Sequence, residues 1–195
     1  MNEQEFETID FTNPDEYQRW SAINDNVMGG ISIGQLYYDG KTCRFLGELS
    51  LENNGGFSSI KRYIEPLSKE VNTIELIFTG DGHTYQLRLT TWKNGERIQY
   101  KHDFTTTRGK QQKKTFHLHN FQAVFRGQLL NHAPKLVAED IKQVGFLITN
   151  KQTLPFYLNL AQIQFKTLKN YTTPQSIPES AQTLLPLLCR NNKRH

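Results

Sequence analysis

Alternation of apolar and polar residues is the strongest pattern in the chain, and it predicts β-strands along most of the sequence. In the segment 42–51, Phe45 and Leu49 fall on one face. Arg44 and Glu48 fall on the other face, as in a strand with one side buried. Further segments with strand patterns are 35–38, 57–63, 73–79, 84–92, 98–106, 115–118, 121–125, 144–149 and 156–168.

Turn signals separate these segments. Asp39-Gly40 and Asn94-Gly95 are dipeptides typical of tight hairpins. Short helical turns are expected at 14–20, where Pro14 follows a possible Asn13 cap, and at 138–143. Many short strands with turns between them predict an all-β sandwich or barrel rather than a parallel α/β sheet.

The sequence divides into residues 1–170, a single sandwich domain, and residues 171–195, a C-terminal tail. The tail contains Pro174 and Pro178, which break any strand, and an apolar cluster at 184–188 before a basic end. A tail that docks on the sandwich or stays mobile is one interpretation. A short interaction segment is the other.

Composition narrows the class of protein. The chain has 195 residues, a formal charge of +4 and an estimated pI of 9.0. Cys43 and Cys189 are too few and too far apart for a disulfide framework or a zinc site, so we expect reduced thiols. The acidic N-terminus is unlike a targeting peptide, and no apolar run is long enough for a transmembrane segment. We therefore expect a cytoplasmic protein.

Two segments rich in Asn and Gly are the main candidates for a site. They are Asn24–Gly30 (NDNVMGG) and Glu52–Phe57 (ENNGGF). Asn, Asp and Gly tolerate positive φ, so consecutive tight turns with a purely structural role are one interpretation. Loops whose polar groups contact a ligand are a second. A calcium site is a third, although the regular spacing of a calcium loop is absent.

Signals for catalysis or cofactor binding are weak. His117 and His119 alternate on a predicted strand and supply at most half of a metal site. Gly80-Asp81-Gly82 lacks the lysine and the helix of a phosphate loop. We therefore expect no catalytic residue, no metal and no cofactor. The basic run 101–114 is more typical of a solvated loop than of a nucleic-acid footprint, so no nucleic-acid partner is expected.

Several motifs together resemble the complex I intermediate-associated protein 30 family. Trp20 and Ile23–Ser32 match its first motif, and Phe45–Gly47 and Leu51–Ser59 follow in order. The match continues through Gly80–Gly82 with Tyr85, then Phe121 and Phe125–Gly127. The resemblance implies a galactose-binding-like β-sandwich (a jelly roll), related in fold to carbohydrate-binding modules. It also implies kinship with mitochondrial chaperones that bind assembly intermediates of respiratory complex I.

The resemblance and the residues together favour a non-catalytic domain that binds proteins, with a respiratory-complex assembly intermediate as the candidate partner. In this hypothesis four polar residues fix the loops, and three others are candidate contact residues. The first set is Asp25, Asn26, Glu52 and Asn53, and the second is Trp20, Tyr85 and Arg126. The alternative is a module that binds carbohydrate or a small ligand, which needs an exposed aromatic residue beside a polar cleft. An enzyme would need a cleft with paired ionisable groups.

Overall fold

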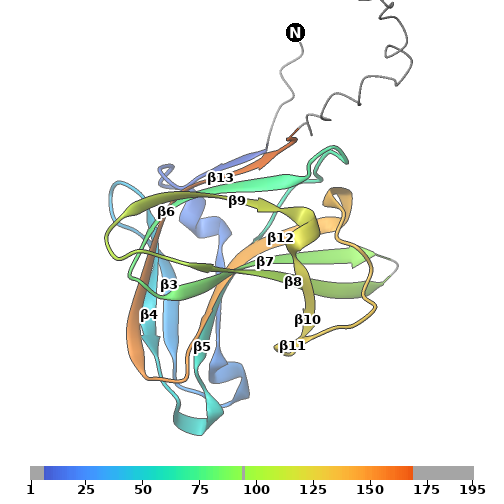
Figure 1. The fold of residues 1–195 in the computed structure, drawn as a ribbon. Helices are drawn as coiled ribbons and strands as arrows, with labels where there is room; N and C mark the ends of the chain where they lie inside the picture. Colours follow the sequence, from blue (N-terminus) through green and yellow to red (C-terminus); the bar gives the residue numbers. More distant parts are fainter. Residues whose placement is uncertain (1–6, 94, 169–195) are drawn as a thin grey trace, which may run out of the picture.

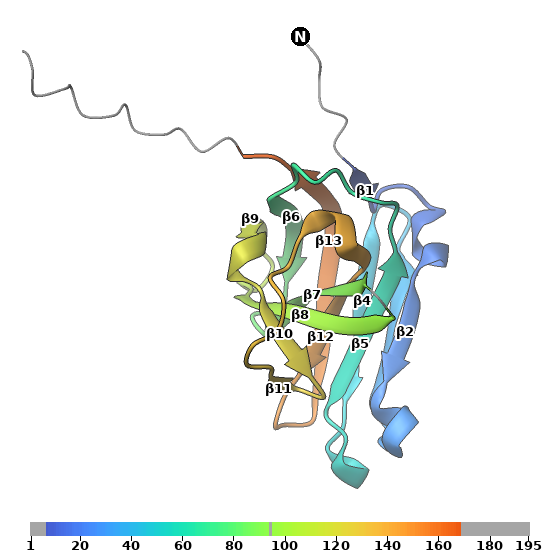
Figure 2. The same ribbon diagram turned by 90° about the vertical axis from the view of Figure 1, so that its right-hand side faces the viewer.

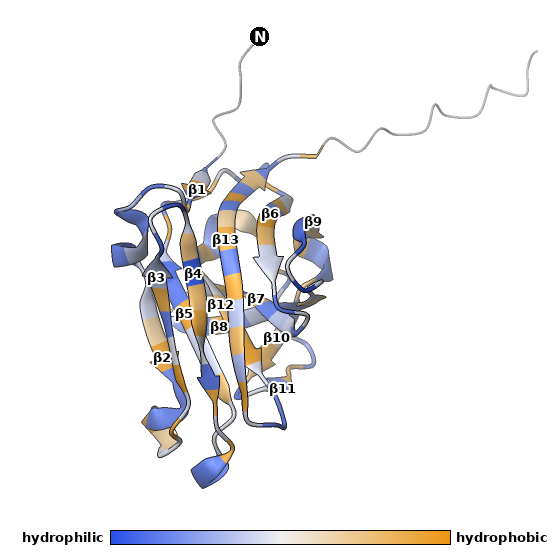
Figure 3. Cartoon of the chain, turned by 90° about the vertical axis from the view of Figure 1, so that its left-hand side faces the viewer, coloured by the Kyte–Doolittle hydropathy of each residue, from blue (hydrophilic) through white to orange (hydrophobic). Residues whose placement is uncertain are grey.

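Two antiparallel β-sheets pack face to face in the protein (Figure 1). The computed structural model describes residues 7–93 and 95–168. One sheet has the order β3-β4-β13-β6-β9, with β1 beside β13, and faces the viewer in Figure 3. The other has the order β11-β10-β8-β7-β12-β5-β2 and faces the viewer in Figure 2. The predicted β-sandwich is therefore confirmed.

The strands and short helices lie close to the predicted segments. The six-stranded sheet contains β1 (Thr8–Asp10), β3 (Ile33–Tyr38), β4 (Cys43–Leu49), β6 (Thr73–Gly80), β9 (Gln111–His117) and β13 (Leu154–Lys166). The seven-stranded sheet contains β2 (Ser21–Asn24), β5 (Phe57–Tyr63), β7 (Thr84–Lys93), β8 (Glu96–Thr105), β10 (Gln122–Phe125), β11 (Gln128–Leu129) and β12 (Ile141–Thr149). Five 3-10 helices connect them: η1 (Glu16–Arg19), η2 (Asp25–Met28), η3 (Glu52–Asn54), η4 (Leu118–Asn120) and η5 (Ala138–Asp140).

Apolar side chains of the two inner faces form one core. Phe104 of β8 shows how the sheets meet, because its ring contacts Phe78 and Phe116 of the opposite sheet at centroid distances of 5.2 and 5.6 Å. Phe146 of β12 packs on the same ring from within its own sheet at 6.4 Å. Edge-to-face pairs of this kind add to the free energy gained by burying the rings. Figure 3 shows the matching alternation of apolar and polar positions along β4 and β13.

One expected loop proved to be a strand. Residues 108–114 look like a charged loop in the sequence, whereas β9 already begins at Gln111 and pairs with β6 along its whole length. β9 is an edge strand of its sheet. Edge strands are often charged, because charge discourages pairing with a second chain. The strand pattern was therefore hidden by polar residues.

A buried ion pair secures the end of the sandwich near η1. The Arg62 guanidinium pairs with the Glu16 carboxylate, and both side chains are less than 9% exposed. The Trp20 indole also donates a hydrogen bond to Glu16, at 2.9 Å, and its ring stacks on Phe146. Trp20 therefore belongs to the core, with its polar N–H satisfied inside the protein.

A buried aspartate performs a similar task at the turn between β6 and β7. Asp81 accepts a hydrogen bond from the Tyr85 hydroxyl at 2.9 Å and another from the Tyr157 backbone N–H at 2.7 Å. Tyr85 is completely buried. Because Tyr157 belongs to β13, the carboxylate ties the β6–β7 turn to the neighbouring strand.

The C-terminal tail, including Cys189 and the cluster at 184–188, falls outside the described residues, so its separation from the sandwich stays a prediction. Within residues 7–93 and 95–168, none of the helices has the length and apolar character needed to cross a membrane.

Replacing Tyr85 with Phe tests the Asp81 link. We expect Tyr85→Phe to lower the free energy of unfolding by about 2 kcal/mol, because a buried hydrogen bond to a charged acceptor is lost. Urea unfolding followed by tryptophan fluorescence measures this change. Tyr37→Phe is the matched control, since Tyr37 is 55% exposed. Equal stabilities for the two variants would contradict a structural role of the Tyr85 hydroxyl.

Candidate binding site at the glycine-rich end

The two glycine-rich segments meet at one end of the sandwich, at the bottom of Figure 1, where η2 and η3 lie. The contact between them is the side chain of Asp25, which is completely buried. Its carboxylate accepts the backbone N–H of Ser32 at 2.9 Å and that of Gly56 at 2.7 Å. The Phe57 N–H at 3.3 Å and the Ser32 hydroxyl complete the shell. One carboxylate thus holds both segments together.

Glycine is required beside this carboxylate for lack of space. A Cβ atom on Gly55 would approach Asp25 Oδ2 to 2.6 Å, and a Cβ on Gly30 would collide with the same side chain. Gly29, with φ of 90°, ends η2 in the left-handed conformation that glycine adopts without strain. The Gly-Gly pairs are therefore explained by packing and backbone geometry alone.

Neighbouring polar side chains extend the network to the adjacent strands. The Ser32 hydroxyl also accepts the Ser50 N–H at 2.9 Å. The Asn24 side chain accepts the Ser58 hydroxyl at 2.6 Å and donates to the Gly34 carbonyl at 3.2 Å. We call Asp25, Ser32, Asn24 and Ser58 the Asp25 knot. Ser32 and Ser58 were not singled out from the sequence, because nothing in a serine's local context shows a partner that is distant along the chain.

Hydrogen bonding sets the charge state of Asp25. Burial alone would raise the pKa of this carboxyl, but the hydrogen bonds from Ser32, Gly56 and Phe57 outweigh burial and leave the pKa below its usual value. The group is therefore a carboxylate at neutral pH. Its hydrogen-bond acceptors are occupied by protein donors, which does not favour the calcium interpretation of the two segments.

Exposed apolar side chains surround the knot. Val27, Met28 and Ile33 are each about 70% exposed, at 70%, 68% and 68%, and Ile31 is 50% exposed. Leu51, just before η3, is 41% exposed. We call these five residues the apolar rim. The knot holds their backbone in fixed turns, so the rim is presented to solvent on an ordered loop.

The structure brings together four of the seven sequence-predicted site residues. Asp25 is the knot itself, while Asn26, Glu52 and Asn53 lie exposed on η2 and η3 beside the rim. Asn53 has a φ of 55°, which explains an Asn at that position. Asp25 holds the loops through its hydrogen bonds, whereas the roles of Asn26 and Glu52 stay predictions.

The other three predicted residues lie elsewhere. Trp20 and Tyr85 are buried, and their polar atoms bond to Glu16 and Asp81, so direct contact with a partner does not fit their positions. Arg126 lies in the β10–β11 turn, at the opposite edge of the seven-stranded sheet from β2. Its guanidinium lies 5.3 Å from the ring of Phe125, which is exposed.

Other chemical candidates gain little from the structure. The rings of His117 and His119 lie 5.3 Å apart, but in the described part of the chain no third His, Cys, Asp or Glu joins them to hold a metal ion. Cys43 is buried, and burial, with the nearby Glu16 carboxylate, raises the pKa of its thiol to about 11. A thiol of this kind is a poor nucleophile.

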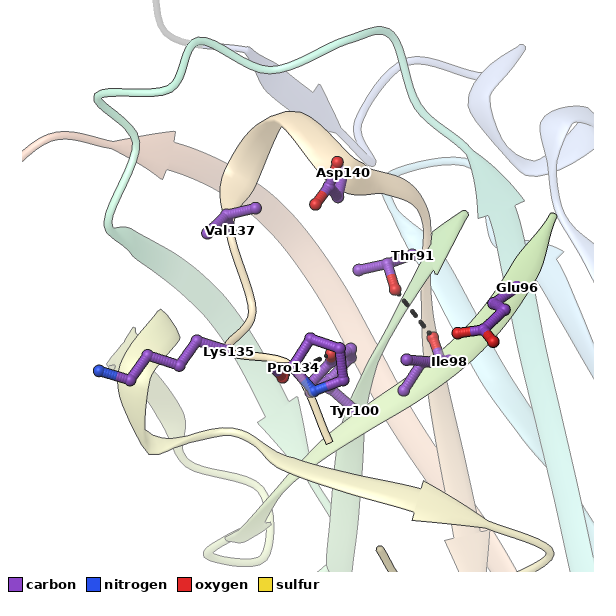
Figure 4. A pocket seen from close by; sticks show the side chains of 8 residues that line it. All are labelled: Thr91, Glu96, Ile98, Tyr100, Pro134, Lys135, Val137 and Asp140. Carbon is purple, nitrogen blue, oxygen red and sulfur yellow. Dashed lines mark hydrogen bonds between the residues drawn. The ribbon is translucent and has the colours of Figure 1, made fainter. Parts of the chain in front are cut away.

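A cavity of about 440 Å³ opens between the β7–β8 hairpin and the segment 134–140 (Figure 4). Thr91, Ile98 and Tyr100 line one wall. Pro134 and Val137 line the other, and the Tyr100 hydroxyl donates to the Pro134 carbonyl at 2.9 Å. No sequence pattern indicated this cavity, because residues 134–137, which form part of its wall, have no strand or helix pattern.

Comparison with known proteins defines the relatives of the chain. The family model for complex I intermediate-associated protein 30 matches residues 9–160, which include the knot and the rim. A search of curated proteins finds no match to the chain.

Solved structures with a similar fold include carbohydrate-binding modules. The family 11 module of the cellulase Lic26A-Cel5E from Clostridium thermocellum matches 86% of this chain and 98% of its own, with a TM-score of 0.61 and 8% identity. The same family's module in complex with a β-1,3-1,4-mixed-linked tetrasaccharide matches 84% and 97%, with a TM-score of 0.60 and 10% identity. The likeness in structure establishes the galactose-binding-like sandwich. Identities this low say nothing about ligands.

Replacing Asp25 with Asn tests the knot. An amide presents one acceptor atom instead of two, so we expect Asp25→Asn to lower the free energy of unfolding at pH 7 by about 3 kcal/mol. Because folding lowers the pKa of Asp25, its stabilisation is complete above the unfolded value of about 3.9 and is lost as the pH falls below it. The gap between wild type and variant should therefore narrow in acid.

Urea unfolding between pH 7 and pH 2.5 measures both effects. Asp39 and Glu75 also have lowered pKa values, so the free energy of unfolding of the variant should still fall in acid, although less than that of wild type. Glu48→Gln, which changes an exposed side chain of β4 outside the two loops, is the control. A gap that stays constant with pH would show that the charge of Asp25 does not stabilise the fold.

Proposed function

Because the chain belongs to the complex I intermediate-associated protein 30 family, we propose that it is a non-catalytic binding domain that assists protein assembly through the apolar rim. The observation that carries this proposal is the exposure of Val27, Met28, Ile31 and Ile33 on a loop fixed by a buried carboxylate. Isolated exposed apolar residues are common on protein surfaces, whereas a contiguous group is typical of an interaction site.

The geometry of the rim supports binding to a protein. The exposed residues are aliphatic or Met, and a flexible thioether adapts to different partner surfaces. Asn26, Glu52 and Asn53 border them with exposed polar groups. An apolar centre with a polar border is the usual composition of a protein–protein interface. Because the knot orders the loops before binding, little conformational entropy is lost on association.

The partner class follows from the family. An assembly factor of respiratory complex I binds incomplete intermediates, whose subunit interfaces are still uncovered and apolar. The rim fits such a surface because both are apolar. We propose this binding role in place of an enzymatic one.

Affinity capture tests the rim. We expect the tagged protein to retain complex I subunits from a native lysate, and the double variant Val27→Ser, Met28→Ser to retain at least about fivefold less, because roughly 2–4 kcal/mol of apolar contact is removed. Quantitative mass spectrometry measures retention. Tyr37→Ser, on the outer face of the six-stranded sheet, is the control. The proposal fails if the rim variant and wild type retain equal amounts.

A second candidate function is the binding of a carbohydrate or another small ligand in the cavity of Figure 4. Its volume of about 440 Å³ is within the usual range for ligand sites, and an aromatic ring, Tyr100, lies beside polar groups of Thr91 and Asp140. Tyr100 is only 3% exposed, so the cavity supplies the polar groups of the expected sugar site but not its exposed aromatic residue.

A thermal-shift screen against mono- and oligosaccharides tests this candidate. A ligand at 100 times its dissociation constant should stabilise the fold by about 2.7 kcal/mol, which raises the melting temperature by several degrees. Val137→Trp, which fills the cavity, should abolish the shift, whereas the rim variant should keep it. If no sugar shifts the melting temperature at millimolar concentration, this function is excluded for the sugars screened.

A further inference from the structure

The outer face of the seven-stranded sheet carries a row of cations. Lys61 of β5 pairs across Gly145 of β12 with Arg88 of β7, and Arg88 pairs with Lys101 of β8. Residues paired directly across antiparallel strands point to the same face. The preceding residue in β5, Ile60, is buried in the core, so this row lies on the outer face of the sheet.

A fourth cation lies at the side of this row. Arg97 of β8 is paired with Trp92, and its guanidinium lies 5.6 Å from the centre of the Trp92 ring. Its Nη2 atom is 3.5 Å from the side-chain oxygen of Gln143, on β12. The positive charge of Arg97 also helps to lower the pKa of the Lys61 ammonium group. We call Lys61, Arg88, Arg97 and Lys101 the cationic face.

The cations on the outer faces of the two sheets differ in their carboxylate partners. On the outer face of the six-stranded sheet the cations have carboxylate partners: Arg44 pairs with Asp39 at 3.2 Å, and Lys113 and Lys166 pair with Glu75 at 2.9 and 2.8 Å. On the cationic face Lys101 pairs with Asp103 at 2.7 Å. The other three cations have no carboxylate within 4.0 Å in the described ranges 7–93 and 95–168.

Two of these unpaired cations are partly withdrawn from water. Burial is the main cause that lowers the pKa of both Lys61 and Arg88, and at Arg88 the Asp103 carboxylate opposes this effect in part, whereas Lys61 has no such carboxylate. The Arg88 Nε donates only to the Gln86 amide oxygen, at 2.9 Å. Desolvating a charge without a counter-charge costs free energy. An anion bound on this face would recover part of that cost, and the chain itself supplies none among its described carboxylates near Lys61.

We infer that the cationic face binds an acidic, extended peptide segment of the protein partner, an inference that rests on the proposed function. Gln86 and Gln99 lie on the same outward face, in the rows beside the cations. Their amides are both donors and acceptors, as peptide groups are. The row spans three strand spacings, or about 14 Å, which is the length of four to five extended residues.

The same face is poorly suited to a neutral sugar. Sugar hydroxyls need acceptors, and the carboxylate of Asp103 is already paired with Lys101. Arg97 covers the Trp92 ring, which would otherwise be the stacking surface. The face therefore takes carboxylates of a peptide, while the apolar rim at the end of the sandwich makes a separate contact.

Fluorescence anisotropy with a fluorescein-labelled eight-residue peptide of alternating Glu and Ser tests the inference. We expect saturable binding that weakens as salt is raised, because the contacts are ionic. The double variant Lys61→Gln, Arg97→Gln should bind about tenfold more weakly. Lys113→Gln, which removes one strand cation from the outer face of the other sheet, should bind within twofold of wild type. Lys61→Glu alone serves if the double variant does not fold.

Three outcomes would overturn the inference. The first is that a peptide with Gln in place of Glu binds as tightly as the acidic peptide. The second is that Lys113→Gln weakens binding as much as the double variant does. The third is that an oligogalacturonate or a single-stranded oligonucleotide of equal charge binds more tightly than the acidic peptide. Failure here is distinguishable from failure of the proposed function. Capture of complex I subunits that depends on the rim, together with no peptide binding, removes only the cationic face from the mechanism.

Discussion

The hydrogen-bonding requirement of one buried carboxylate organises the candidate binding end of this protein. Asp25 has no contact with water, so its charge depends on donors supplied by the chain. Those donors come from Ser32, Gly56 and Phe57, in segments on either side of β3 and β4. The turns that follow β2 and β4 can therefore take only the conformations that aim these N–H groups inward. The position of the rim is a consequence of that constraint.

Charge burial recurs at three places, with a different structural result each time. Glu16 with Arg62 and Trp20 secures the end of the sandwich near η1, and Asp81 ties the β6–β7 turn to β13. In each case a carboxylate is satisfied by protein donors, so it is unavailable to a ligand. The cationic face differs because Lys61 and Arg88 are partly desolvated and have no carboxylate within 4.0 Å among the described residues. In this fold, a charged group that lacks a partner within the protein is a better indicator of function than a charged group that is merely buried.

The sequence was sufficient for the fold because strand alternation and turn dipeptides are local signals. β5, predicted at 57–63, has the same limits in the structure. β9 was missed in part because its polar edge residues hide the strand pattern. For the site, local signals identified Asp25 and the glycines. The burial of Trp20 and Tyr85 depends on rings that are distant in sequence, Phe146 and Phe104, although their hydrogen-bond partners are only four residues away. An aromatic residue beside a glycine-rich turn has the same local pattern whether it points to solvent or into the core.

Local sequence signals do not reveal the cationic face either. Lys61, Arg88 and Lys101 are separated by at least 13 positions, and each belongs to an ordinary alternating strand. Only the register of β5, β12, β7 and β8 places them in one row, with Gly145 leaving the space between Lys61 and Arg88 free of a side chain. A Cβ atom at Gly145 would approach the Ile60 carbonyl to 2.5 Å, so close packing of the strands already requires glycine there. The same residue that allows β5 and β12 to pack thus leaves open the centre of the surface where an acidic segment would lie.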